Sequence, residues 1–222
     1  MITSLAIVPS APVLLARFTG RVDAGAGVRV LAHQAVRAAV SVADEVVLVC
    51  ATDREPRHSG ASFGEQVGEL LLAEAAMSTR TEVVAWDADV DECRARGAAI
   101  GASLGSARCA LVVVADGSAC RGEKAPGHLD ERAFGVDRDW LDALGAVEPD
   151  TIYPAPMEPA PVRAAIDRER LLRLGPALAA EVMFHGRAPL QVMAAALGPS
   201  LTAFGMRGGD PFGVRYVTLA AR

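Results

Sequence analysis

A glycine-rich polar segment, residues 116–132, holds the densest set of side chains able to bind or react with a small molecule. Its sequence is DGSACRGEKAPGHLDER, and it directly follows the apolar run Ala110–Ala115 (ALVVVA). A glycine-rich turn presents backbone N–H groups to an anion, and Arg121 and Lys124 would add positive charge. Alternatively, the segment is a solvated loop in which Asp130 caps the next helix. The candidate binding residues here are Asp116, Gly117, Ser118, Arg121, Lys124 and His128.

A second polar segment, Thr52–Gly64, follows the apolar run Glu45–Ala51 (EVVLVCA) and contains Asp53, Arg54 and His58. Its last five residues, GASFG, match Gly-x-Ser-x-Gly, which in α/β-hydrolases exposes a nucleophilic serine at a tight strand-to-helix turn. That turn requires a strand immediately before the motif, whereas the polar stretch TDREPRHS separates the motif from the apolar run. We therefore favour helix N-capping as the role of Ser62, with nucleophilic catalysis as the less favoured alternative.

The spacings that bind nucleotides or zinc are missing from the sequence. Gly25-Ala26-Gly27 has Val30 where a dinucleotide fingerprint needs glycine, and the only lysine, Lys124, lacks the context of a Walker A motif. The four cysteines form no Cys-x-x-Cys pair, and the four histidines form no helical metal-ligand spacing. We assign structural roles to His33 and His185. His33 lies within a predicted helix, and His185 lies at a predicted helix C-terminus, where the helix dipole would stabilise its positive charge. His58 and His128 fall in predicted strand-end loops and remain functional candidates.

Charge and hydropathy argue against several classes of partner. The 222 residues include 22 Lys or Arg and 27 Asp or Glu, for a formal net charge of −5, and 51% are hydrophobic. A general binder of phosphate backbones carries a basic stripe, so nucleic acid is disfavoured. No run reaches the roughly 18 uncharged apolar residues that a membrane span needs. We expect a cytoplasmic protein with reduced thiols and no contact with nucleic acid or membrane.

Short β-branched runs alternate with longer patterns of helical spacing along most of the chain. We predict strands at Leu5–Val8, Glu45–Ala51, Glu82–Trp86 and Ala110–Ala115, and helices at Val28–Ala43, Glu65–Met77 and Val90–Leu104, the last capped by Asp89. A proline-rich stretch, residues 148–162, predicts an extended surface connection. Beyond it we predict short helices at Asp167–Leu174, Pro176–Phe184 and Pro189–Leu197, then strand, turn and strand at Leu201–Met206, Arg207–Gly213 and Val214–Ala220.

This order of elements predicts one α/β domain over residues 1–222, with three layers and a mostly parallel central sheet that is mixed at one edge. In such sheets, ligands bind at the carboxyl ends of the strands. The loops that follow the strands, including both polar segments above, are therefore expected to meet at one edge of the sheet.

Several segments together resemble the class III (LigB-type) extradiol dioxygenases. The opening strand followed by Pro9-Ser10-Ala11-Pro12-Val13-Leu14-Leu15 resembles their Pro-His-Pro-Pro start, and Asp116-Gly117-Ser118-Ala119 resembles their Ser-His loop. Together with residues 116–133, 177–197 and 210–217, these segments are most similar to a short branch of LigB-like proteins from high-GC bacteria. The resemblance covers most of the chain and implies the LigB α/β fold.

The dioxygenases of this family hold Fe(II) with two histidines and one glutamate and use a further histidine as acid and base. By the resemblance, the first ligand position falls on Ser10, and the second falls in the Thr52–Arg54 loop, with His58 several residues later. The acid/base position falls on Ala119, and Glu181, within an amphipathic helix, is no convincing match for the late glutamate. Because serine and alanine cannot replace imidazole, we expect the iron site to be lost and predict no cofactor.

Two functions remain open on these grounds. The first is a non-catalytic pseudoenzyme that binds a small acidic or aromatic molecule, or a protein partner, and that can form a homodimer. Its expected ligand-binding residues are Ser10, Asp53, Arg54, Asp116, Gly117, Ser118, Arg121, Lys124 and His128. The alternative is a metal-dependent oxidoreductase or hydrolase that uses relocated loop residues Asp53, His58, Asp116 and His128. Asp116 and His128 would then be the catalytic candidates.

Overall fold

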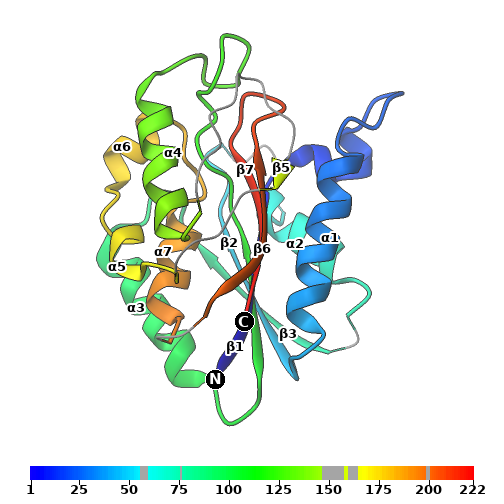
Figure 1. Cartoon of the computed structure of the whole chain (residues 1–222), viewed down its shortest axis with the longest axis vertical. Helices are drawn as coiled ribbons and strands as arrows, with labels where there is room; N and C mark the ends of the chain where they lie inside the picture. Colours follow the sequence, from blue (N-terminus) through cyan, green and yellow to red (C-terminus); the bar gives the residue numbers. More distant parts are fainter. Residues whose placement is uncertain (56–59, 76, 147–157, 160–164, 199–200) are drawn as a thin grey trace.

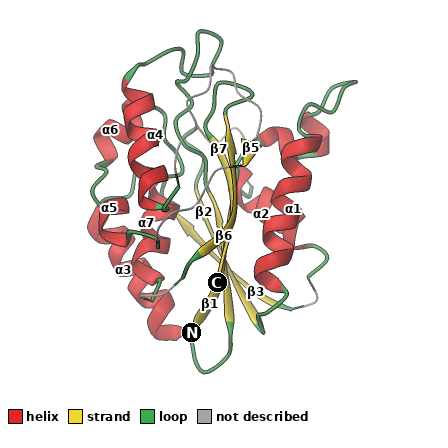
Figure 2. Ribbon diagram, in the orientation of Figure 1, coloured by secondary structure: helices red, strands yellow, loops and turns green. Residues whose placement is uncertain are grey.

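The computed structural model of the chain describes residues 1–55, 60–75, 77–146, 158–159, 165–198 and 201–222. Its strands are β1 (Ile2–Val8), β2 (Glu45–Ala51), β3 (Ser78–Val84), β4 (Cys109–Val114), β5 (Glu158–Pro159), β6 (Ala203–Gly209) and β7 (Tyr216–Ala221). They form one sheet of seven strands in the order β3-β2-β4-β1-β7-β6-β5 (Figures 1 and 2).

The larger part of the sheet, four strands, is parallel, and the remaining three strands form an antiparallel edge. Strands β3, β2, β4 and β1 pair in parallel, whereas β7, β6 and β5 join in antiparallel fashion at the far edge. The prediction of a mostly parallel sheet that is mixed at one edge is confirmed. Strand β4 is buried along its whole length, as its continuously apolar sequence requires of a strand covered on both faces.

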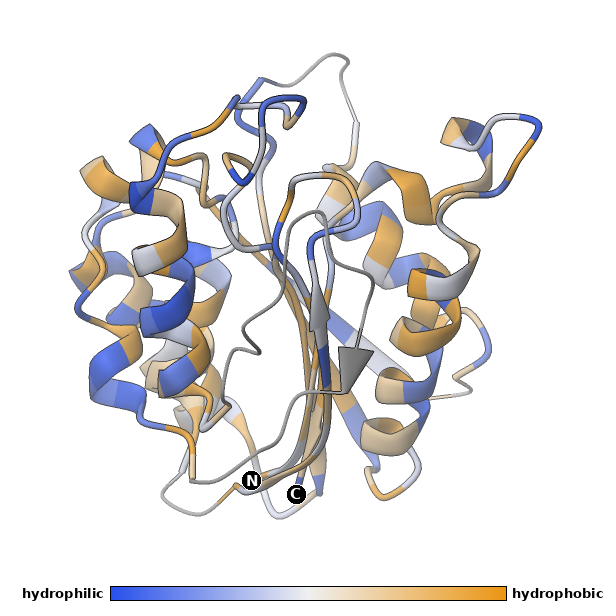
Figure 3. Cartoon of the chain, turned by 45° about the horizontal axis from the view of Figure 1, so that its top comes forward, coloured by the Kyte–Doolittle hydropathy of each residue, from blue (hydrophilic) through white to orange (hydrophobic). Residues whose placement is uncertain are grey.

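Helices cover both faces of the sheet, and two hydrophobic cores lie between them and the strands (Figure 1). One face carries α1 (Ala26–Val40) and α2 (Phe63–Leu72). The other face carries α3 (Val90–Ser103), α4 (Arg132–Ala143), α5 (Arg168–Leu171), α6 (Pro176–Glu181) and α7 (Arg187–Ala196). Two 3₁₀ turns, Pro12–Leu14 and Ala16–Phe18, follow β1. Figure 3 shows hydrophobic residues along the central strands between the two helical layers.

Local rules account for some of the element boundaries. Strand β2 has the predicted bounds, and Asp89 caps α3 by accepting a hydrogen bond from Glu92 N at 2.7 Å. Strand β3 begins four residues before the predicted position, and these four residues are exposed and polar. They belong to the strand because they pair with β2 at the edge of the sheet, which does not require them to be buried. Most of the proline-rich stretch lies outside the described residues, apart from β5, which pairs with β6.

Candidate functional site

A cavity of about 470 Å³ opens at the carboxyl ends of β1, β2 and β4. We call it the cleft. Four of the residues predicted from sequence line it: Ser10 after β1, Asp53 and Arg54 after β2, and Asp116 after β4. The other lining residues are Pro12, Ala51, Thr52, Glu55, Phe63, Val114, Met183, His185 and Gly186. The structure therefore brings together three loops that are far apart in the sequence, at the edge where parallel sheets bind ligands.

Asp116 is the carboxylate at the tip of β4. The backbone N–H of Ser10 donates a hydrogen bond to Asp116 Oδ1 at 2.8 Å, which ties the loop after β1 to the loop after β4. Burial raises the pKa of Asp116 to about 7, although the Ser10 hydrogen bond opposes this shift. A carboxyl group with such a pKa exchanges its proton near neutral pH and can act there as a donor or an acceptor.

The end of α6 turns the chain back toward the cleft. Phe184 N donates to Ala179 O at 2.7 Å and Met183 N donates to Ala180 O at 3.3 Å, which is the pairing of a Schellman motif. Glycine is usual at the left-handed position of this motif, but here Met183 occupies it, with φ of 49°. The left-handed backbone is unfavourable for methionine, and its side chain lines the cleft.

Close backbone contacts hold the segment after this turn against the loop after β4. Gly186 N donates to Asp116 O at 3.1 Å, and Ser118 Oγ donates to Val182 O at 2.5 Å. A Cβ on Gly186 would lie 2.1 Å from Asp116 O, so only glycine allows this approach. Through this contact, His185 joins Asp116 in the lining of the cleft.

His185 is a functional candidate that the sequence did not indicate. Its Nε2 is buried and has no hydrogen-bond partner, and its ring lies 5.9 Å from that of Trp86. Burial and the nearby charge of Arg54 lower the pKa of His185, so the neutral imidazole is favoured. Our interpretation of His185 as a histidine at a helix C-terminus was wrong, because α6 ends at Glu181 and His185 precedes α7. Gly186, the next residue, is the one feature of this segment of the sequence that could have indicated its close contact with the backbone of another segment.

In the described part of the loop after β2, Arg54 contributes a cation and Asp53 an anchored carboxylate to the cleft. Asp53 accepts a hydrogen bond from Phe63 N, at the start of α2, at 3.0 Å. The guanidinium of Arg54 lies 5.1 Å from the centre of the Trp86 ring and donates to Ala180 O at 3.2 Å. Thr52 Oγ1 accepts from Trp86 N at 3.1 Å, which fixes this loop to the one after β3. Arg54 is exposed, and its contacts leave it available to an anion in the cleft.

The remaining predicted residues do not line the cleft. Gly117, Ser118 and Arg121 are buried, and Arg121 forms ion pairs with Asp137 and Asp210 at 2.9 Å each. Lys124 lies with Arg121 at a different cavity of about 590 Å³, between the loop after β4 and the β6–β7 turn. His128 is exposed, with φ of 58°. His58 lies outside the described residues. The full set of nine predicted ligand-binding residues is therefore not gathered at one site.

Ser62 begins α2 with a capping box. Its side chain accepts from Glu65 N at 3.2 Å, and Glu65 Oε2 accepts from Ser62 N at 2.7 Å. The N-capping role is confirmed. Ser62→Ala should lower the free energy of unfolding by about 1 kcal/mol, the usual value of such a cap. Urea denaturation measures this, with Ser41→Ala, an exposed serine after α1, as the control. An unchanged midpoint for Ser62→Ala would contradict the capping role.

The described residues do not fit the Fe(II) centre of the LigB-type dioxygenases. Ser10 offers a hydroxyl at the position that the resemblance assigns to the first ligand, and Asp53 accepts a hydrogen bond from the backbone N–H of Phe63. Among the described residues, no group of three or more histidine, cysteine, aspartate and glutamate side chains is placed to hold a metal ion. Among the described residues that line the cleft, His185 is the single histidine.

Within the parts of the chain that the structure describes, none of the helices combines the length and the apolar character needed to cross a bilayer. No protein-family model matches the chain, and a comparison with curated proteins gives no match.

Proposed function

We propose that this chain is a LigB-like protein without the family's iron triad, and that it binds a small acidic or aromatic molecule in the cleft. The observation that supports this most is the convergence of Ser10, Asp53, Arg54 and Asp116 on one open cavity of about 470 Å³. Cavities of about 300–1,000 Å³ are typical of small-molecule sites.

The chemistry of the wall favours an aromatic acid. Arg54 supplies a positive charge at the cleft, and its guanidinium lies over the ring of Trp86, which also lies 5.9 Å from the ring of His185. Asp116 would donate or accept a hydrogen bond from the ligand, since its pKa is about 7, and His185 would do so through its buried Nε2, which has no partner among the described residues. Apolar side chains, including Pro12, complete the wall.

The alternative, a metal enzyme built from Asp53, His58, Asp116 and His128, has less geometric support. Asp53 and Asp116 share the cleft, but His128 does not line it and His58 lies outside the described residues. The homodimer and the cytoplasmic location stay predictions from sequence.

Arg54→Met should weaken binding of benzoate about tenfold or more, because a hydrogen bond to a charged group contributes about 1.5–3 kcal/mol. The measurement is a titration followed by the indole ¹⁵N–¹H signals of the two tryptophans, with Trp86 assigned through Trp86→Phe. Benzoate should move the Trp86 signal, and benzyl alcohol should bind more weakly because it carries no charge.

Lys124→Met is the matched control, because it removes an exposed cation at the other loop cavity. Its affinity for benzoate should equal that of the unmodified protein. Equal affinities for Arg54→Met and Lys124→Met, or no movement of the Trp86 signal, would overturn the proposal.

A further inference from the structure

Strand β3 lies at one edge of the sheet, and its outer side has no neighbouring strand in the described part of the chain. The first four residues of the strand are exposed. Thr52 N, just beyond β2, donates a hydrogen bond to Val84 O at 2.9 Å, so the backbone groups of Val84 point toward β2. Because successive residues of a strand direct their N–H and C=O groups to opposite edges, those of Thr79, Thr81 and Val83 point outward. This edge is therefore open to another strand.

The charges on β3 have opposite signs on the two sides of Thr81. Arg80 is exposed and forms no ion pair with any described residue. Glu82 pairs with Arg96 of α3 at 2.7 Å, and Arg96 also pairs with Glu92 at 2.9 Å. Two carboxylates thus share one arginine, so this group keeps one negative charge. The edge presents a positive and a negative charge, neither of them neutralised, two residues apart along the strand.

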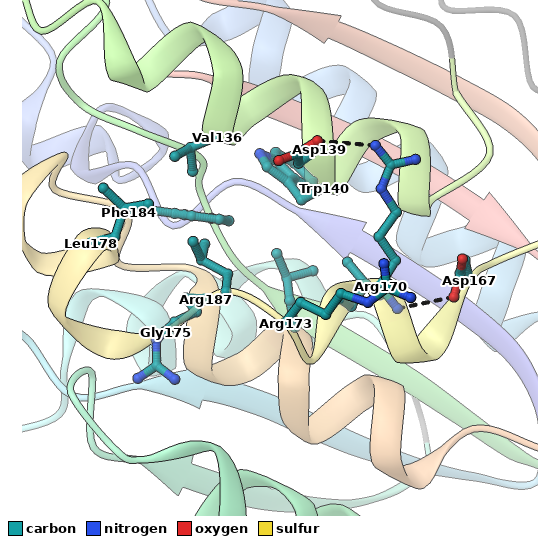
Figure 4. Close-up of a pocket in the computed structure, with 13 residues that line it drawn as sticks. Val136, Asp139, Trp140, Asp167, Arg170, Arg173, Gly175, Leu178, Phe184 and Arg187 are labelled. Atoms are coloured by element: carbon teal, nitrogen blue, oxygen red, sulfur yellow. Dashed lines mark hydrogen bonds and ion pairs between the residues drawn. The ribbon is translucent and has the colours of Figure 1, made fainter.

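Two arginines on the α3 side of the sheet show, in contrast, how a charge is neutralised within the chain. At a cavity of about 560 Å³ in the layer of α4 to α7, Arg170 pairs with Asp139 at 3.0 Å (Figure 4). Arg132, at the start of α4, pairs with Glu181 of α6. Arg80 differs from both, because no described carboxylate pairs with it. A carboxylate of another molecule can therefore bind it without displacing one of this chain.

A second copy of the chain matches both charges of the edge at once. When two β3 strands lie antiparallel about a two-fold axis at Thr81, Arg80 of each copy lies opposite Glu82 of the other. Thr81 then exchanges N–H···O hydrogen bonds with its counterpart, and Thr79 exchanges them with Val83, which are the residues whose backbone groups point outward. A shift of the register by two residues would place Arg80 opposite Arg80, or Glu82 opposite Glu82. The charges therefore select one register.

Helix α3, which packs beside β3, leaves room for this approach. Arg96 and Ser103 of α3 contact β3 through Glu82 and Arg80. Ala99 lies between them on the same stripe of the helix and is exposed, as is Ala95 one turn earlier. Short side chains at these positions allow the same helix of a second copy to pack alongside, at the separation of about 8–10 Å that is usual for packed helices.

We propose that the outer edge of β3 binds the same edge of a second copy of this chain, which joins two sheets into one across a two-fold axis and brings the two α3 helices together. The match of Arg80 with Glu82 across the axis, in a single register, carries this proposal. None of the residues of the contact lines the cleft, so the dimer does not depend on the proposed function of the cleft.

Sedimentation velocity over a series of protein concentrations measures the dimer and its dissociation constant. The unmodified chain should dimerise, and Arg80→Glu should weaken the dimer at least tenfold, because both charge pairs across the axis then join two carboxylates. Arg207→Glu is the matched control, since Arg207 is an exposed arginine of β6 that lies outside the contact. It should leave the dissociation constant unchanged.

A mixture of two variants tests the register. Glu82→Arg should also weaken self-association, because both pairs then join two arginines, and urea denaturation checks that it folds without its pair to Arg96. Mixing Arg80→Glu with Glu82→Arg restores opposite charges at both pairs, so the mixed dimer should form at least tenfold more tightly than the dimer of either variant alone. The proposal is overturned if the unmodified chain stays monomeric at every concentration, if Arg80→Glu and Arg207→Glu behave alike, or if mixing does not restore the dimer.

Discussion

Asp137→Ala is expected to lower the free energy of unfolding by about 3–5 kcal/mol, the usual result of breaking a buried ion pair by removing one partner. Asp137 and Arg121 are both fully buried and form an ion pair at 2.9 Å. Asp137 Oδ1 also accepts hydrogen bonds from Ser118 N at 3.0 Å and Trp140 Nε1 at 2.9 Å. The variant thus leaves a buried cation short of one partner and leaves two donors without acceptors.

Thermal and urea denaturation measure this effect. For a chain of this length the loss corresponds to a fall of roughly 6–20 °C in Tm. Asp139→Ala is the matched control, because it removes a carboxylate of the same helix whose side chain is 76% exposed and whose pair with Arg170 contributes at most about 1 kcal/mol. Similar losses for the two variants would show that the buried cluster does not stabilise the fold as described.

The cluster also explains why the loop after β4 presents so few of its polar residues to a ligand. Arg121 joins this loop to α4 through Asp137 and to the β6–β7 turn through Asp210. Asp137 binds the backbone of Ser118. The charges near the start of the loop therefore hold it in place, and Asp116, two residues beyond the end of β4, is left as the group of this loop that lines the cleft.

Asp116→Asn is expected to stabilise the protein at pH 8 and to flatten the dependence of stability on pH. The folded-state pKa of Asp116 is raised to about 7, above its ordinary value of 3.8. Its contribution to stability is therefore fully present below about pH 4 and is lost as the pH rises through 7. At about 1.4 kcal/mol for each pKa unit, this loss amounts to roughly 4 kcal/mol at pH 8, and an uncharged amide avoids it while still accepting from Ser10 N.

The measurement is urea denaturation of both proteins at several values between pH 4 and 8. The difference between them should grow with pH in favour of the asparagine variant, and subtracting the two curves removes the opposite contribution of His185, whose lowered pKa makes stability fall as the pH falls. Asp44→Asn is the control: Arg108 holds the pKa of Asp44 at about 2, below this range of pH. Parallel curves for Asp116→Asn and the unmodified protein would show that the carboxyl is ionised throughout.

Local sequence signals predicted the elements well because their causes are local. The continuous apolar run of β2 needs burial on two faces, and Asp89 and Ser62 cap helices through N–H groups three residues away. The order of these elements was enough to predict the parallel part of the sheet and its antiparallel edge. The loops that follow the strands were also correctly expected to meet, which placed Ser10, Asp53, Arg54 and Asp116 together.

Which polar residues face a ligand was decided only by the tertiary structure. Arg121 and Arg54 look alike in the sequence, yet Arg121 is neutralised by carboxylates 16 and 89 residues away while Arg54 remains exposed. His185 reaches the cleft because a helix ends in a left-handed turn and Gly186 contacts the backbone of Asp116, 70 positions earlier in the chain. The sequence by itself determined the α/β elements and their capping, which depend on neighbours within a few residues. The pairing and burial of charges depend on contacts between distant segments, so only the folded structure decides which charges are left for binding.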